Sequence, residues 1–260
     1  MRRVALIPAR LGATRFPRKL LAVLGGRTVI RRTYEAVRDT GLFESVLVVT
    51  DSSDIAEEVA RAGGRVTMSR RPHESGTDRI AEAAEEMEGD VFVNVQGDEP
   101  FTRREPLARL LAAFEGPGGN AVRVASLVQA LTEPALVRDP NYVKVALDLA
   151  GNALFFSRSP IPYPRDPAAH PTYWEHIGVY GFRREALLAF ARLPAGPLER
   201  AEKVECLRFL EHGIGIRMVA TDYMGVEIDT PEDLVRAERL LAERGEPARA
   251  PGREEEGTRS

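Results

Sequence analysis

Cysteine is almost absent from this chain. Its 260 residues include one cysteine, Cys206, which excludes both an intrachain disulfide and a cysteine-based metal cluster. An unpaired thiol is typical of a reducing compartment, so we expect a cytoplasmic protein. As a catalytic nucleophile, Cys206 would need a cationic setting that lowers its pKa. The sequence around it shows no such setting.

Long apolar runs and an excess of basic charge are also missing. The amino-terminal residues MRRVALIPAR have only a short apolar run, too short for a signal-peptide core or a membrane span. The 36 basic and 39 acidic residues give a net charge of −3. This balance argues against nucleic acid as the main partner, because such a partner favours a basic surface. With 43% hydrophobic residues, the composition is that of an ordinary globular protein with a substantial core.

The stretch VALIPARLGATRFPRKLL, at residues 4–21, joins a short apolar run to a cationic loop. The run is typical of a buried strand. Loops at the carboxyl ends of strands in an α/β sheet converge on the ligand crevice. Arg10 can offer a fork of hydrogen bonds to a phosphate and Lys19 a compact charge. The loop therefore predicts a phosphate ligand, although its charge alone also fits a solvated loop with no ligand.

Strand-like and helix-like segments alternate through the first half of the chain, which is typical of a parallel sheet with right-handed crossovers. Strands are predicted at 4–7, 46–50 and 90–95, and helices after Thr28, at 54–61, after Thr77 and at 106–114. From residue 121 to 182, β-rich runs replace most helices, so we expect antiparallel additions to the sheet.

A polar loop, MSRRPHESGTDR at residues 68–79, precedes one of these helices. A helix amino terminus after Ser-Gly-Thr offers backbone N–H groups to an anion. Helix capping by Thr77 alone is the simpler explanation.

Two carboxylates stand at positions that suit a hard cation. Asp98 follows the predicted central strand within QGDEP, beside a glycine that permits close backbone approach. In isolation, Asp98 also fits a turn. Thr230 and Asp233 are explained as the capping pair of the last helix, but Asp229 precedes the cap and has no such explanation. Together, Asp98 and Asp229 predict a Mg²⁺ site.

Several of these motifs carry a family resemblance: IPAR, then TRFP, then Lys19, QGDEP at Gln96–Pro100 and IDTPEDL at Ile228–Leu234. In this order and spacing they closely resemble the 3-deoxy-manno-octulosonate cytidylyltransferases, or CMP-KDO synthetases, from residue 3 to about residue 243. The resemblance implies a three-layer α/β/α nucleotidyltransferase fold, with a mostly parallel, Rossmann-like sheet and a β-rich insertion. The implied reaction transfers a cytidylyl group from CTP to KDO, releasing pyrophosphate, for lipopolysaccharide-type surface polysaccharides. It also implies Mg²⁺ as cofactor and a homodimer, with neither nucleic acid nor membrane as a partner.

The resemblance divides the chain into one nucleotidyltransferase domain, 1–243, and a tail, 244–260, whose polar sequence predicts disorder. Within the domain, residues 1–119 would bind the nucleotide, 120–229 the sugar and the second subunit, and 230–243 would form a closing helix.

By resemblance, each matched residue also receives a role. Arg10, Lys19, Asp98 and Asp229 would be catalytic, with Asp98 and Asp229 as metal ligands. The nucleotide would contact Pro8, Ala9, Arg10, Thr14, Lys19, Arg70, Arg71, Ser75, Thr77, Arg79 and Gln96. The sugar would contact Arg158, Arg165, His176, Tyr180 and Glu205.

Some of these roles have alternatives. His176 and Tyr180 share one face of a predicted strand, where a satisfied core histidine is the simpler explanation of His176. Glu205 lies with Glu202 on a helix predicted at 198–211. The family usually has Gln after this glutamate, whereas this chain has Cys206, so KDO, an amino-substituted KDO and related acidic sugars stay open as acceptors.

Two other functions share part of this pattern. CMP-sialate synthetases share IPAR but typically continue with a Lys-Gly-Ile-Pro-like sequence where this chain has Thr14-Arg15-Phe16-Pro17. A nucleotide-binding regulator without catalysis would not need both metal carboxylates together with Arg10 and Lys19.

Overall fold

The computed structural model describes residues 1–243 apart from positions 14, 74, 167 and 223–224. The tail predicted at 244–260 lies outside the described residues. The described strands form one nine-stranded mixed sheet and a separate two-stranded hairpin. None of the described helices is long and apolar enough to cross a membrane.

The large sheet has a parallel half and a half extended by antiparallel strands. Its path is β11-β7-β10-β6-β1-β4-β5, with β8 and β9 added beside β10. The pairs β1–β4, β1–β6, β4–β5 and β7–β11 are parallel, and β10 pairs antiparallel with β6, β7 and β8. The expected antiparallel additions thus belong to the same sheet, and β10 joins its two halves. The strands are β1 (Arg3–Ala9), β4 (Ser45–Thr50), β5 (Arg65–Met68), β6 (Val91–Asn94), β7 (Val124–Leu131), β8 (Lys144–Leu147), β9 (Ala153–Ser157), β10 (Tyr173–Arg183) and β11 (Ile216–Ala220), and the hairpin is β2 (Val23–Leu24) and β3 (Arg27–Thr28).

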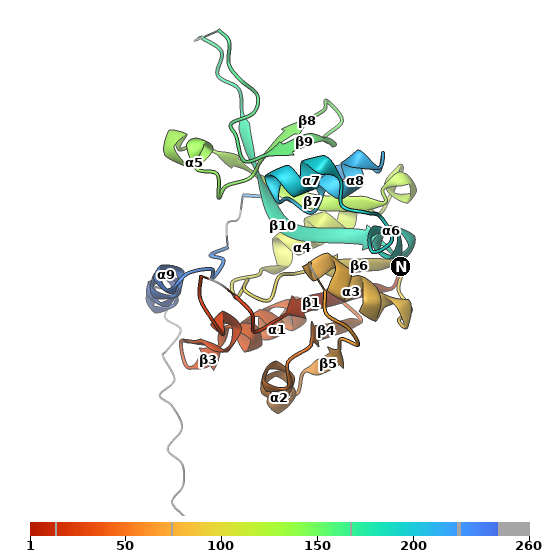
Figure 1. Cartoon of the computed structure of the whole chain (residues 1–260), viewed down its shortest axis with the longest axis vertical. Helices are drawn as coiled ribbons and strands as arrows, with labels where there is room; N and C mark the ends of the chain where they lie inside the picture. The colour runs from red at the N-terminus through yellow and green to blue at the C-terminus, as the bar shows by residue number, and fades with distance from the viewer. Residues whose placement is uncertain (14, 74, 167, 223–224, 244–260) are drawn as a thin grey trace, which may run out of the picture.

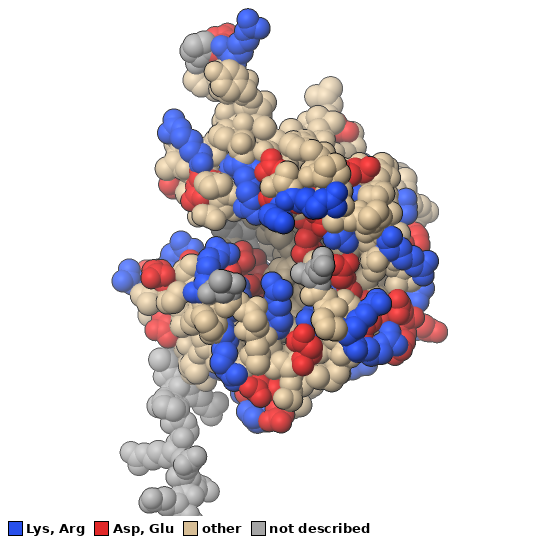
Figure 2. All heavy atoms as spheres, in the orientation of Figure 1, with Lys and Arg blue, Asp and Glu red and all other residues tan. Residues whose placement is uncertain are grey.

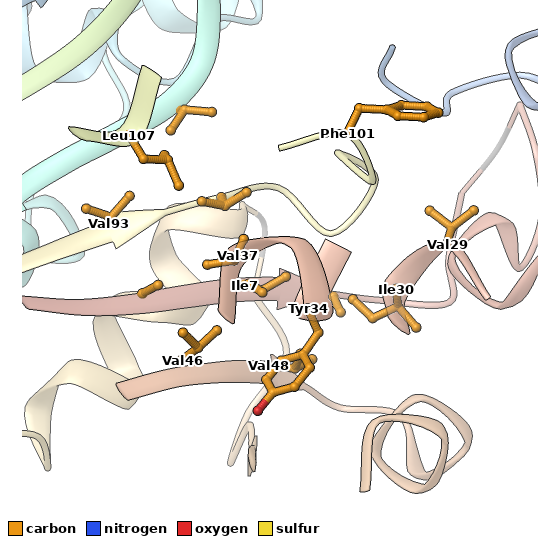
Figure 3. Close-up of a cluster of buried hydrophobic side chains, with 14 of the residues drawn as sticks. Ile7, Val29, Ile30, Tyr34, Val37, Val46, Val48, Val93, Phe101 and Leu107 are labelled. Atoms are coloured by element: carbon orange, nitrogen blue, oxygen red, sulfur yellow. The ribbon is translucent and has the colours of Figure 1, made fainter. Parts of the chain in front are cut away.

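Helices cover both faces of this sheet, which gives three layers (Figure 1). On β1, Ala5 and Ile7 face one layer while Val4 and Leu6 face the other, because successive strand residues point to opposite sides. The first layer contains α1, α2, α4 and α9, and Figure 3 shows part of its contact with the sheet. The second contains α3, α6 and α8. The helices are α1 (Val29–Asp39), α2 (Ser53–Arg61), α3 (Gly76–Glu85), α4 (Arg104–Ala112), α5 (Pro134–Arg138), α6 (Arg184–Phe190), α7 (Pro197–Glu202), α8 (Leu207–Glu211) and α9 (Pro231–Glu243), with 3₁₀ turns at Lys19–Leu21 and Gly119–Ala121.

Two predicted caps are confirmed and one is wrong. Thr28 accepts a hydrogen bond from the backbone N–H of Arg31 at the start of α1. At α9, Thr230 and Asp233 bond reciprocally at 2.9 and 3.2 Å. At α3, however, Ser75 is the cap, because its Oγ accepts the N–H of Asp78 at 3.0 Å.

The helix predicted at 198–211 is also wrong. Lys203 adopts a left-handed conformation, φ 53°, which ends α7 and separates it from α8. The glutamates before and after Lys203 contact different elements. Glu202 bonds Ser157 Oγ at 2.8 Å at the end of β9, whereas Glu205 accepts from Thr77 Oγ1 of α3 at 2.9 Å. The two glutamates predicted to be close therefore serve different parts of the structure.

Candidate functional site

A cavity of about 330 Å³ opens at the carboxyl ends of β1 and β6. Around this cavity, Gly76 and Gly97 let their backbone segments lie close to Pro8. A Cβ on Gly97 would lie 3.0 Å from the Pro8 carbonyl oxygen, and one on Gly76 would lie 3.2 Å from Pro8 Cγ. Most of the residues predicted to bind a nucleotide line this cavity: Pro8, Ala9, Arg10, Lys19, Ser75, Arg79 and Gln96. Three loops far apart in the sequence thus meet around one space.

The cavity wall carries an uncompensated cation. Arg10 is exposed there, and among the described residues no carboxylate pairs with it. By contrast, the Arg79 guanidinium is buried and donates to Ser69 Oγ and to Asp51 Oδ2, each at 2.8 Å. Arg10 is thus available to an anionic ligand, while Arg79 holds the ends of β4 and β5 in place.

Lys19 and the two predicted metal ligands form a compact cluster. The Lys19 ammonium donates to Asp98 Oδ2 and, at 2.7 Å, to Asp229 Oδ1. A backbone hydrogen bond of 3.0 Å, from Ile228 N–H to the Asp98 carbonyl oxygen, brings the two segments together. The side chains of Lys19, Asp98 and Asp229 are only 13%, 14% and 28% exposed. Although burial disfavours its charged form, Asp98 and Asp229 outweigh that effect and raise the pKa of Lys19.

Sequence reasoning missed a third carboxylate, Glu227. One oxygen from each of Asp98, Glu227 and Asp229 lies within 4.8 Å of the others. Carboxylate oxygens are the donors that hard divalent cations prefer, so this set fits such an ion. The signal was present in the sequence, because residues two apart on an extended segment point to the same side.

Two glutamates at this cluster are harder to ionise than usual. Burial and the nearby Asp98 and Glu175 raise the pKa of Glu99 to about 7. Glu227 is exposed, but desolvation by the surrounding protein, together with Asp98, Glu99 and Asp229, raises its pKa to about 8. The cluster therefore concentrates negative charge for which Lys19 is the bridging cation.

A second cavity, of about 520 Å³, adjoins the first and shares Arg15 and Asp229 with it. Figure 2 shows this face hollowed between the part that carries β8 and β9 and the part that carries α1 and α9. Arg158 and His176 line the second cavity. The Arg158 guanidinium donates to the backbone carbonyls of Glu202 and Pro140 at 2.6 and 2.8 Å.

The remaining predicted sugar contacts lie apart from the second cavity. Glu205 lines the first cavity instead, and Tyr180 is buried in the core of the second layer. Arg165 is exposed on the loop that joins β9 to β10, which projects from the body (Figure 1), and it lines neither cavity. The sugar-binding roles of these three residues stay predictions.

Among the predicted nucleotide contacts, three described residues lie away from the first cavity. Arg70 forms ion pairs with glutamates of α3, and Arg71 lines a separate, shallow cavity. The Thr77 hydroxyl is directed at Glu205. Their roles also stay predictions, and Thr14 lies outside the described residues.

His176 lies in a row of aromatic rings. Its ring centroid is 5.0 Å from that of Phe156 and 5.3 Å from that of Tyr180, which agrees with the prediction that His176 and Tyr180 share a face. Its Nε2 is 3.1 Å from Ser126 Oγ. Burial lowers the pKa of His176 to about 4, so the imidazole is neutral at physiological pH.

Cys206 is fully buried. Burial raises the pKa of its thiol far above the usual range, even though the Tyr180 hydroxyl is close enough to bond it. A thiolate nucleophile at this position is therefore disfavoured.

The comparisons with known proteins follow the same motifs. The family model described as Cytidylyltransferase matches residues 4–218. The 3-deoxy-manno-octulosonate cytidylyltransferase of Christiangramia forsetii is 52% identical over 239 residues, covering 92% of this chain and 96% of the relative. The protein of the same name from Flavobacterium johnsoniae is 51% identical, covering 93% and 99%.

Solved structures also include a similar synthetase. A CMP:2-keto-3-deoxy-manno-octonic acid synthetase in complex with CTP has a TM-score of 0.88 and 37% identity, covering 94% of this chain and 100% of that one. The 4-diphosphocytidyl-2C-methyl-D-erythritol synthase of Anaerococcus prevotii, at 15% identity and a TM-score of 0.62, shares the fold.

Proposed function

Because the chain belongs to the cytidylyltransferase family, we propose that it transfers a cytidylyl group from CTP to KDO, giving CMP-KDO and pyrophosphate. The names of its relatives and the CTP complex of a similar synthetase support this choice of substrates. The observation that carries the proposal is that two cavities meet at Asp229, beside a partly buried lysine and two further carboxylates.

In this proposal, the triphosphate of CTP lies in the first cavity and KDO in the second. Arg10 binds phosphate oxygens with its guanidinium fork. Lys19 moves from its carboxylates to the phosphates, where it neutralises charge that develops on the leaving pyrophosphate. Arg15, shared by the two cavities, is close enough to both ligands to orient them.

The reaction is a single displacement. The anomeric hydroxyl oxygen of KDO attacks the α-phosphorus, and the bond from that phosphorus to pyrophosphate breaks on the opposite side. Such chemistry needs mainly positioning and charge neutralisation, so the protein forms no covalent intermediate.

We propose Mg²⁺ as the cofactor. Asp98 and Asp229, joined by Glu227, would hold it, since their oxygens lie within 4.8 Å of one another. When bound there, it would lower the pKa of the attacking hydroxyl and neutralise phosphate charge. Lys19 bonds Asp98 and Asp229, and Arg15 pairs with Asp229 as well. In this proposal both cations turn toward the ligands, which leaves these carboxylates to the ion.

The organisation of the chain is part of the proposal. Residues 1–119 supply most of the first cavity and 120–229 most of the second. Thr230, Asp233 and Arg236 extend the wall of the second cavity, which the helix at 230–243 would close. Exposed apolar side chains at Leu149, Leu154 and Tyr163 support a homodimer contact near β8 and β9. The single unpaired cysteine supports a cytoplasmic location.

Pyrophosphate release tests the substrates. Purified protein with Mg²⁺ is given CTP or UTP, crossed against KDO, an amino-substituted KDO, a sialic acid and a sugar 1-phosphate. Release with CTP and KDO is expected. Release with a different acceptor would refute the sugar assignment, and no release in any combination would favour a regulator that binds nucleotide without turnover.

A further inference from the structure

The carboxylate of Glu82 on α3 is buried, 5% exposed, and has no part in the proposed chemistry. Its Oε1 accepts the backbone N–H of Arg70 at 2.6 Å and the Arg70 Nε at 3.3 Å. Its Oε2 lies 2.6 Å from His73 Nε2 and 3.5 Å from Arg71 Nε. One side chain thus holds three residues of the loop between β5 and α3.

This loop forms one wall of the first cavity. His73 lines the cavity together with Ser75 and Gly76, while Glu82 itself does not line it. Other side chains anchor the two ends of the loop: Arg79 bonds Ser69 at 2.8 Å, and Ser75 caps α3. Among the described residues, the middle of the loop depends on Glu82.

Charge explains why a carboxylate is needed there. Arg70, Arg71 and His73 lie within four positions of one another, and two of them are permanently charged. Burial disfavours an ionised Glu82, but the hydrogen bonds from Arg70 and His73 outweigh that effect and lower its pKa. A buried carboxylate bonded in this way is costly to disturb, because its partners lose a buried acceptor.

Two neighbouring glutamates, at the end of α3 and just after it, offer a contrast. Glu85 and Glu86 also pair with the Arg70 guanidinium, at 3.1 and 2.6 Å, but they are 47% and 73% exposed. Exposed pairs of this kind contribute little. Among the loop residues that the structure describes, neither of the two glutamates bonds the backbone.

We propose that Glu82 is a positioning residue for nucleotide binding. It holds residues 70–73 in the conformation that presents His73 to CTP in the first cavity, and it does not touch the nucleotide. The identity of the ligand as CTP rests on the proposed function. Loss of this anchor weakens CTP binding without slowing the chemical step or changing the affinity for KDO.

The test compares Glu82→Gln with Glu85→Gln, a matched change one turn along the same helix. Glutamine keeps the size of the side chain and one acceptor, but it turns an amide donor toward His73 or Arg70. In Glu82→Gln without ligand, the backbone amides of Arg70, Arg71 and His73 should exchange with solvent about tenfold faster. By calorimetry with Mg²⁺, its Kd for CTP should rise about tenfold, with kcat at saturating CTP within about twofold of the wild type. Glu85→Gln should match the wild type in each measurement.

Two results would overturn the proposal. One is unchanged loop exchange or CTP affinity in Glu82→Gln. The other is a lower melting temperature and kcat with an unchanged KM for CTP, which would show a purely structural role. If the wild type binds CTP but does not transfer a cytidylyl group to KDO, the proposed function fails. The hydrogen exchange and the calorimetry still decide this inference.

Discussion

Removal of the Lys19 ammonium should make folding stability depend on a divalent cation. In Lys19→Met, Asp98 and Asp229 lose the charge that now bridges them. Two carboxylates about 5 Å apart repel by roughly 3 kcal/mol at an effective dielectric constant near 20. Deletion of one partner from a buried ion pair costs about 3–5 kcal/mol, and the partial exposure of these side chains favours the lower end.

We therefore expect Lys19→Met to lose about 3 kcal/mol of unfolding free energy without metal. For a domain of this size, that loss lowers the melting temperature by roughly 6–12 °C. A cation at 100 times its Kd should restore about 2.7 kcal/mol. The wild type should gain less from the same ion, because Lys19 must first leave.

Thermal unfolding in EDTA and in rising Mg²⁺ or Mn²⁺ measures both effects. Arg18→Met is the matched control: Arg18 is adjacent, and its ion pair with Asp54 is exposed, so its loss should cost less than about 1 kcal/mol. If Lys19→Met melts like the control in EDTA, or gains no more from metal than the wild type, the bridging role of Lys19 is refuted.

Three further variants test neighbouring parts of the account. Asp98→Asn should nearly abolish turnover while circular dichroism shows an intact fold, and full activity would refute its role as a metal ligand. Glu227→Gln should weaken Mn²⁺ binding, measured by electron paramagnetic resonance with CTP present, by about tenfold; unchanged affinity would exclude Glu227 from the metal site. His176 is neutral when folded and has a pKa near 4, against 6.5 unfolded, so the unfolded state binds more protons between these values. The contribution of His176 to stability should fall by up to about 3 kcal/mol as pH drops from 6.5 to 4, while the raised pKa values of Glu99 and Glu227 act in the opposite direction in both proteins. In urea unfolding, His176→Gln should therefore be less sensitive to acid than the wild type, and an equal pH dependence would contradict the neutral imidazole of the folded state.

Much of the fold could be predicted because local patterns and tertiary contacts agree. The β-branched runs became β4 and β6, and the capping residues of α1 and α9 lie where expected. Asp98 and Asp229 were expected to meet because a site for a hard cation needs carboxylates from distant parts of the chain, and the cap of the last helix does not explain Asp229. A backbone hydrogen bond between their segments brings them together.

What could not be predicted depends on contacts between distant residues. Ser75, not Thr77, caps α3 because Thr77 is drawn to Glu205, 128 positions away. The left-handed Lys203 divides a continuous helical pattern, because Glu202 and Glu205 bond different elements. Similarly, periodicity predicts that β10 is a strand but not that it lies between β6 and β7. Glu227 was not predicted for another reason. It lies two positions before Asp229 on a short extended segment, and the helix start that follows is the stronger local pattern.

The central claim is that the anomeric oxygen of KDO attacks the α-phosphorus of CTP, and an isotope label tests it most directly. KDO equilibrated in ¹⁸O-water carries the label at its anomeric hydroxyl, and ³¹P NMR detects ¹⁸O bonded to phosphorus by its shift. The account predicts labelled phosphorus in the CMP-sugar product and none in pyrophosphate. Unlabelled product phosphorus, or label in pyrophosphate, would contradict it.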